Sequence, residues 1–101
     1  MKKFVYLYFV SKTIPDDAEN GAIWGKWFES IGEHLIDAGN AFESSSQAQV
    51  SDGKVTMDPD EIAGYTIVKA DSLEEAVTWV KEGPLGSMKN LQVRVYEAQP
   101  M

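Results

Sequence analysis

The segment from 62 to 98 constrains the fold of this chain more than any other part of the sequence. Its parts, in order, are a strand at 63–69, a helix capped by Asp71 or Ser72, a stop at Gly83-Pro84 and a second strand at 91–97. Glu74 and Glu75 fall in the first turn of this helix, where the helix dipole favours acidic side chains. The pattern therefore predicts a strand, a capped helix and a strand, which is half of an α+β domain.

The first half of the chain repeats this unit. An apolar strand is predicted at Phe4–Val10, and a helix is predicted from about Ala22 to Ala38. One face of this helix carries the apolar residues at helical spacing. These residues are Trp24, Trp27, Phe28, Ile31, Leu35 and Ala38. Gly39-Asn40 follows, and a glycine there supplies the left-handed residue that commonly ends a helix.

The first strand is apolar on both of its faces. Side chains alternate along a strand, so Val5, Leu7 and Phe9 point away from the side that Tyr6 and Tyr8 occupy. Such a strand belongs in the middle of a sheet that is covered on both sides. Two helices cover only one face of so small a sheet. A second copy of the chain is the simplest cover for the other face, so we expect a homodimer.

The middle of the chain is more polar than either half. We interpret 41–50 as an edge strand because central strands are rarely this hydrophilic. Asp52-Gly53 indicates a hairpin turn, 55–57 a short returning strand, and 58–61 a solvated acidic loop. The resulting order, βαββαβ, predicts one ferredoxin-like domain over 1–101 with an antiparallel sheet and the first and third strands at its centre.

Composition excludes several classes of function. The chain has 101 residues, 44% of them hydrophobic, which supports one domain with a core of its own. It has no cysteine, so disulfides and thiolate chemistry are excluded. A net charge of -7 argues against nucleic acid and against anionic membrane surfaces as partners. No segment has the roughly 20 apolar residues of a membrane span, and we expect a cytoplasmic protein.

The arrangement of motifs resembles the YCII-related family, including its DGPF-type branch. The similarity spans nearly the whole chain. The matching segments are 1–8, 35–40, 52–55, 64–76 and 93–96, of which Gly64-Tyr65 followed by Ala70-Asp71-Ser72-Leu73-Glu74-Glu75-Ala76 is the most specific. The resemblance implies a dimeric α/β barrel, in which two ferredoxin-like sheets pack face to face. Most members of the family have no established activity, and a few resemble small-molecule lyases or dehydrohalogenases.

This chain departs from the family pattern at two places that bear on chemistry. Many members carry a histidine early in the first helix, and that position falls near Trp27 or Phe28 here. The DGPF tract is replaced by Asp58-Pro59-Asp60-Glu61. No catalytic residue is therefore carried over from the family.

His34 is the candidate general base, since histidine is the usual base near neutral pH and this is the only one in the chain. Asp37 lies three residues later, close enough on a helix to orient the imidazole. The alternative interpretation is a partly exposed histidine beside local acids, with no catalytic role.

Arg94 and Tyr96 are candidates for ligand binding. They lie opposite Val93 and Val95 on the last strand, so they point into the barrel if the helices cover the valines. An arginine there could hold a carboxylate or phenolate through two hydrogen bonds. The alternative is an ion pair at the subunit interface, with Glu43 or Glu97 as partner.

Three tyrosines are further candidates for ligand contacts. Tyr6 and Tyr8 share a face of the first strand, and Tyr65 on the third strand could join them in a small aromatic pocket. The alternative is packing at an interface with the hydroxyl groups satisfied.

These features predict a small homodimeric protein that binds an aromatic or carboxylated molecule. If it is an enzyme, lyase or isomerase chemistry without a cofactor fits best, with His34 as base and Arg94 as anion holder. Neither a metal site nor a nucleotide-binding motif is present in the sequence. The alternative function is a non-catalytic protein whose barrel face serves only dimerisation or regulatory binding.

Overall fold

A computed structural model describes residues 1–10, 18–43, 46–57, 62–88 and 90–100. The predicted acidic loop at 58–61 lies outside these ranges. The elements, in order, are β1 (Lys2–Val10), α1 (Ala18–Ile31), a 3₁₀ turn (Gly32–His34), β2 (Leu35–Asp37), β3 (Ala48–Ser51), β4 (Lys54–Met57), β5 (Ile62–Ala70), α2 (Leu73–Lys81), a second 3₁₀ turn (Pro84–Ser87) and β6 (Leu91–Glu97). No helix in the described ranges combines the length and the apolar character that crossing a bilayer requires.

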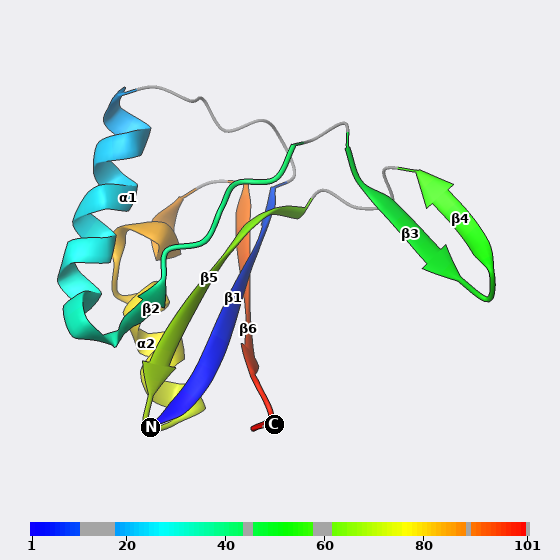
Figure 1. Ribbon diagram of the computed structural model, residues 1–101. Coiled ribbons are helices and arrows are strands. Elements are labelled where there is room, and N and C mark those ends of the chain that lie inside the picture. The colour runs from blue at the N-terminus through cyan, green and yellow to red at the C-terminus, as the bar shows by residue number, and fades with distance from the viewer. Residues whose placement is uncertain (11–17, 44–45, 58–61, 89, 101) are drawn as a thin grey trace.

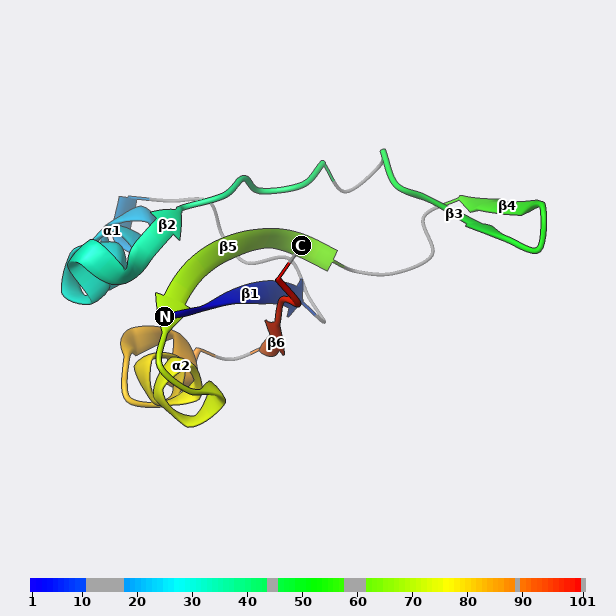
Figure 2. The ribbon, with the colours of Figure 1, turned by 60° about the horizontal axis from the view of Figure 1, so that its bottom comes forward.

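The main sheet has the strand order β2-β5-β1-β6, and each of its neighbouring pairs is antiparallel. Both helices lie on one side of this sheet (Figure 1, Figure 2). This is the ferredoxin-like arrangement, and it confirms that the first strand and the strand before α2 occupy the centre. The α+β fold class is confirmed with it.

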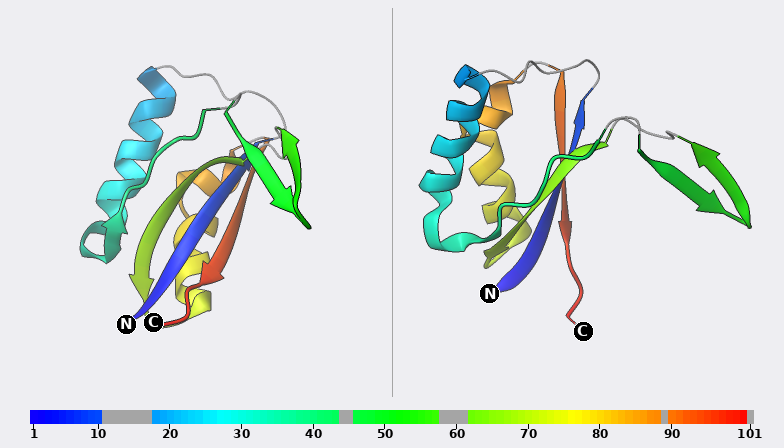
Figure 3. Two further views of the ribbon diagram at one scale, coloured as in Figure 1. Left: turned by 45° about the vertical axis from the view of Figure 1, so that its right-hand side comes forward. Right: turned by 45° about the horizontal axis from the view of Figure 1, so that its top comes forward.

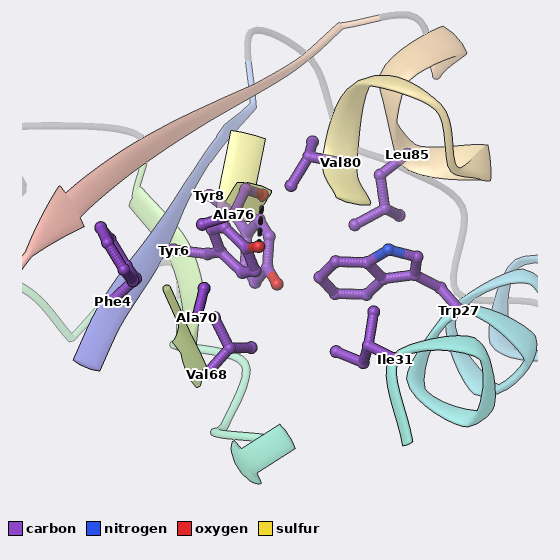
Figure 4. Close-up of a cluster of buried hydrophobic side chains, with 10 residues drawn as sticks. All are labelled: Phe4, Tyr6, Tyr8, Trp27, Ile31, Val68, Ala70, Ala76, Val80 and Leu85. Carbon is purple, nitrogen blue, oxygen red and sulfur yellow. Dashed lines mark hydrogen bonds between the residues drawn. The ribbon is translucent and has the colours of Figure 1, made fainter. Parts of the chain in front are cut away.

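The core lies between the sheet and the helices. Trp27 reaches from α1 toward Tyr6 of β1, between Ile31 and Leu85 (Figure 4). The indole and the Tyr6 ring are 5.6 Å apart between centroids. The indole nitrogen donates a hydrogen bond of 3.0 Å to the carbonyl of Trp79, so this side chain also ties α1 to α2.

The second helix begins where its sequence predicts. The Ser72 hydroxyl accepts a hydrogen bond from the backbone N–H of Glu75, which is the expected cap. Leu73, Ala76, Val77 and Val80 have the spacing of one apolar stripe, but Leu73 and Val77 are exposed. The buried positions of this helix are Ala76 and Val80. The small side chain of Ala76 lets α2 approach the sheet closely.

The first helix is shorter at its end than predicted. It stops at Ile31, where Gly32 adopts a φ of +50°, and the chain then turns into β2. Leu35 pairs with Val68 of β5, so a residue assigned to the helical stripe belongs to the sheet. Ladder hydrogen bonds to β5 replace the helical ones that the periodic pattern suggested. Gly39 does have a positive φ, of +80°, but it follows a strand and caps no helix.

The predicted polar edge strand at 41–50 is also wrong in part. The edge of the main sheet is β2, extended by a single bridge between Ala41 and Gly64. Residues 48–57 instead form a separate two-stranded hairpin (Figure 1). Its predicted turn is confirmed, since Asp52 and Gly53 both have positive φ, as a type I′ turn requires.

Val95 should contribute to stability through its position beneath the helices. It faces the core with Val93, whereas Gln92 is exposed on the other side of β6. Val95→Ala is expected to lower the free energy of unfolding by about 1–3 kcal/mol, through lost burial and a small cavity. Gln92→Ala is the control and should change it by less than about 0.5 kcal/mol. Urea unfolding measures both variants. A loss in Val95→Ala within experimental error would mean that the two faces of β6 are assigned the wrong way round.

Candidate functional site

The side of the main sheet that faces away from the helices forms a continuous surface with an apolar centre. We call it the open face. It comprises Lys3, Val5, Leu7, Phe9, Tyr65, Ile67, Lys69, Gln92, Arg94 and Tyr96, which the strand pairing places together. Its members on β1 are only half-buried in one chain. The first strand is therefore apolar on both faces, as the sequence predicts, and one of these faces is left without a cover from the helices (Figure 2).

Arg94 is the charged group near the middle of the open face. It lies opposite Leu7 in the ladder, and its guanidinium sits 4.3 Å from the centroid of the Phe9 ring. This contact holds the cation over an aromatic face. Across the part of the chain that the structure describes, no carboxylate lies within ion-pair distance of Arg94. Glu97, one of the two acids predicted as its partner, pairs with Lys2 at 3.7 Å.

Tyr65 lies on the other side of Leu7 from Arg94. Leu7 pairs with both residues, so the three form one row across β5, β1 and β6. Adjacent strands are about 4.8 Å apart, which puts roughly 10 Å between the backbones of Tyr65 and Arg94.

Two neighbours position the Tyr65 side chain. Phe42 stacks on its ring with centroids 5.7 Å apart, and the amide of Asn40 donates a long hydrogen bond of 3.5 Å to its hydroxyl. Gly39 lets the chain after β2 pass close to Tyr65, because a Cβ atom at position 39 would overlap the Tyr65 carbonyl oxygen. Tyr96 is less constrained: it lies opposite Val5 and is exposed.

Tyr6 and Tyr8 do not belong to the open face. Their side chains point toward the helices and are buried, and Tyr6 pairs with Thr66 rather than with Tyr65. The pocket that was predicted from all three tyrosines is therefore wrong. Adjacent residues of a strand point to opposite faces, so the register that pairs Leu7 with Tyr65 separates Tyr65 from both of them.

The hydroxyls of these two tyrosines are already used inside the protein. Tyr6 donates to the carbonyl of Ala76 at 2.6 Å. Tyr8 donates to the Thr66 hydroxyl at 2.7 Å, and Thr66 in turn donates to the carbonyl of Ala38. Burial raises the pKa of both tyrosine hydroxyls. For Tyr8 the hydrogen bond to Thr66 acts in the opposite direction on the pKa, but it is the smaller effect. They act as structural anchors between the sheet, α2 and the chain after β2.

His34 lies on the helix side of the sheet, at the end of the 3₁₀ turn that follows α1. Its ring is 4.7 Å from the Trp79 ring between centroids. Its Nδ1 atom is buried and has no hydrogen-bond partner among the described residues. Asp37 does not orient it as predicted, because Asp37 belongs to β2 and accepts a hydrogen bond from the backbone of Gly39.

The predicted site residues therefore divide into two groups. Arg94, Tyr96 and Tyr65 share the open face, and His34 lies on the other side of the sheet with the two buried tyrosines. One small molecule in one chain cannot touch both His34 and Arg94. Sequence reasoning missed Phe9 and Phe42, because the register between β1 and β6 decides which face of β1 lies on the side of Arg94.

Comparison with known proteins supports the fold. No protein-family model matches the chain, and no curated protein gives a significant sequence match. One similar solved structure is 5-chloro-2-hydroxyhydroquinone dehydrochlorinase (TftG) from Burkholderia phenoliruptrix AC1100, in complex with 2,5-dihydroxybenzoquinone. The two share 17% sequence identity and a TM-score of 0.58, over 96% of this chain and 93% of the other. At this identity the likeness concerns the fold alone.

Proposed function

We propose that this protein is a homodimer of the YCII-related type that binds a small aromatic carboxylate or phenolate on the open face. The observation that carries the proposal is Arg94. It is an exposed cation beside the apolar centre of this face, held over Phe9, and it has no carboxylate partner in the described chain. An arginine at such a position can hold an anion, because its planar group matches a carboxylate in two hydrogen bonds.

A second copy packed on the open face strengthens this site. Two sheets packed face to face would remove Leu7 and its neighbours from water and surround Arg94 with apolar groups. In such a medium the attraction between a guanidinium and an anion rises several-fold over its value in water. The ligand would lie in the row from Tyr65 to Arg94, with its ring over Leu7 and its acidic group on the guanidinium.

The same geometry supports a catalytic version of the proposal. A cofactor-free lyase or isomerase moves a proton next to a developing charge that the enzyme stabilises. Arg94 would stabilise this charge. His34 is on the wrong side of the sheet to act as the base for a ligand held there, so Tyr65 and Tyr96 are the better placed proton carriers in each chain.

The competing function is a protein whose open face serves only dimerisation. The apolar centre of this face, with Val5, Leu7 and Ile67, is what ordinary interface packing requires. Ligand binding distinguishes the two functions, since a barrel filled by side chains has no affinity for an aromatic anion.

Binding should depend on the anion and on Arg94. We expect 2,5-dihydroxybenzoquinone and benzoate to raise the melting temperature, and benzamide, the neutral counterpart of benzoate, to have no effect. Arg94→Lys should weaken binding about tenfold, because the charge stays but the planar pair of donors is lost. His34→Gln is the control and should change the affinity less than about twofold. Isothermal titration calorimetry measures each dissociation constant.

Two results would contradict the proposal. Equal binding of benzamide and benzoate would remove the role of the anion. Wild-type affinity in Arg94→Lys together with lost affinity in His34→Gln would move the site to the helix side of the sheet. If none of the probes binds, the competing function, in which the open face serves only dimerisation, is favoured.

A further inference from the structure

The hairpin formed by β3 and β4 is the least explained part of the fold. Its strands pair only with each other, over four residue pairs from Ala48↔Met57 to Ser51↔Lys54. It stands apart from the main sheet in Figure 1 and in the right-hand view of Figure 3. A two-stranded hairpin of this size is at best marginally stable in water, so something should cover it.

The two faces of this hairpin differ in character. Cross-strand partners share a face, and so do alternate residues of one strand. One face carries Ala48, Val50, Val55 and Met57, and we call it the apolar face of the hairpin. The other carries Gln49, Ser51, Lys54 and Thr56. On the apolar face Val50, Val55 and Met57 are 70%, 63% and 66% exposed, respectively, so a contiguous apolar strip meets water in the single chain.

The position of the hairpin indicates what covers it. The figures place it on the other side of the main sheet from α1 and α2 (Figure 1, Figure 2, Figure 3). That is the side of the open face. A second copy packed on the open face would therefore lie next to the hairpin, and the two apolar surfaces would form one continuous interface.

We infer that the hairpin is an arm that holds the second copy of this chain, with its apolar face against the partner. The inference rests on the homodimer of the proposed function. In a twofold dimer the arm of each chain would pack on the other chain, so the apolar faces of both hairpins would be buried. A membrane is a poor alternative occupant, because the chain has a net charge of -7 and most anionic lipid surfaces would repel it.

The hairpin offers a matched pair of variants for the test. Val50 and Val55 are direct cross-strand partners on the apolar face, and Gln49 and Thr56 are direct partners on the polar face. The double variant Val50→Asp with Val55→Asp puts two acids on the proposed contact. The control, Gln49→Asp with Thr56→Asp, puts the same two acids one residue away on the opposite face, at a similar cost to the strands.

Sedimentation velocity over a concentration series gives the dimer dissociation constant for the three proteins. We expect the apolar-face variant to weaken the dimer about tenfold or more, because two valines lose their burial, and the control to stay within about twofold. Circular dichroism melting checks that each variant is folded. Hydrogen exchange in the wild type gives an independent measure: the amides of 48–57 should become more protected as the protein concentration passes the dissociation constant.

The outcomes separate the arm from the dimer itself. A wild-type protein that is monomeric at high micromolar concentration overturns both proposals. A wild-type dimer that the two variants leave unchanged, or weaken equally, overturns the arm but leaves the open-face dimer in place. If the apolar-face variant does not fold, exchange in the wild type decides: hairpin protection that is independent of concentration overturns the arm.

Discussion

Replacing Trp27 with alanine is expected to lower the free energy of unfolding by about 3–5 kcal/mol, as for other large aromatic side chains in protein cores. Trp27 is 1% exposed and is among the largest fully buried side chains. It contacts the rings of Tyr6, Trp24 and Phe28. Small domains are stable by only about 5–15 kcal/mol, so the loss is a large share of the total.

The hydrogen bond of Trp27 accounts for a separate part of this effect. Its indole nitrogen donates to the Trp79 carbonyl, which joins the two helices. Trp27→Phe keeps most of the ring but leaves that carbonyl without its donor, and it should cost about 1–3 kcal/mol. Urea unfolding followed by circular dichroism measures both variants. A Trp27→Ala protein with wild-type stability would show that the helices are not held to the sheet through this residue.

The parts of the fold that sequence predicted well are those with strong local signals. β6 and the start of α2 were predicted at their observed positions, because alternation of apolar residues and a serine cap are local properties. The hairpin turn at Asp52-Gly53 was predicted for the same reason, since only a few residue types accept positive φ.

The errors arose where distant contacts decide the structure. Leu35 continues the apolar spacing of α1, so periodicity alone extends the helix through it. The helix ends before Gly32, and Leu35 pairs with Val68, which lies 33 positions later in the sequence. Sequence patterns contain little information on such a pairing, because a free sheet edge competes with the helix for the same residues.

The candidate site shows the same limit. That Arg94 lies on the side opposite Val93 and Val95 could be predicted from alternation within β6. That Tyr6 and Tyr8 lie on the valine side could not, because it depends on the register between β1 and β6. This register pairs Tyr6 with Val95 and Leu7 with Arg94, and a shift of one residue would have exchanged the faces.

Because of this register, charges at two adjacent positions of β1 should have opposite consequences. Leu7→Asp puts a carboxylate on the open face, where water reaches it in the single chain, so the protein should fold as a monomer. Burying this charge in the proposed interface would raise the dimer dissociation constant more than about a hundredfold. Tyr8→Asp puts the same charge into the core and removes the donor to Thr66, so it should unfold the protein.

Circular dichroism melting and sedimentation velocity on the two variants separate folding from association. The expected pair of results is a folded monomer for Leu7→Asp and an unfolded chain for Tyr8→Asp. A folded, dimeric Leu7→Asp protein would show that the open face is not the dimer interface, and it would remove the apolar surroundings that the proposed site at Arg94 requires. The helix-covered core would be unaffected by that result, since it depends on Tyr8 and not on Leu7.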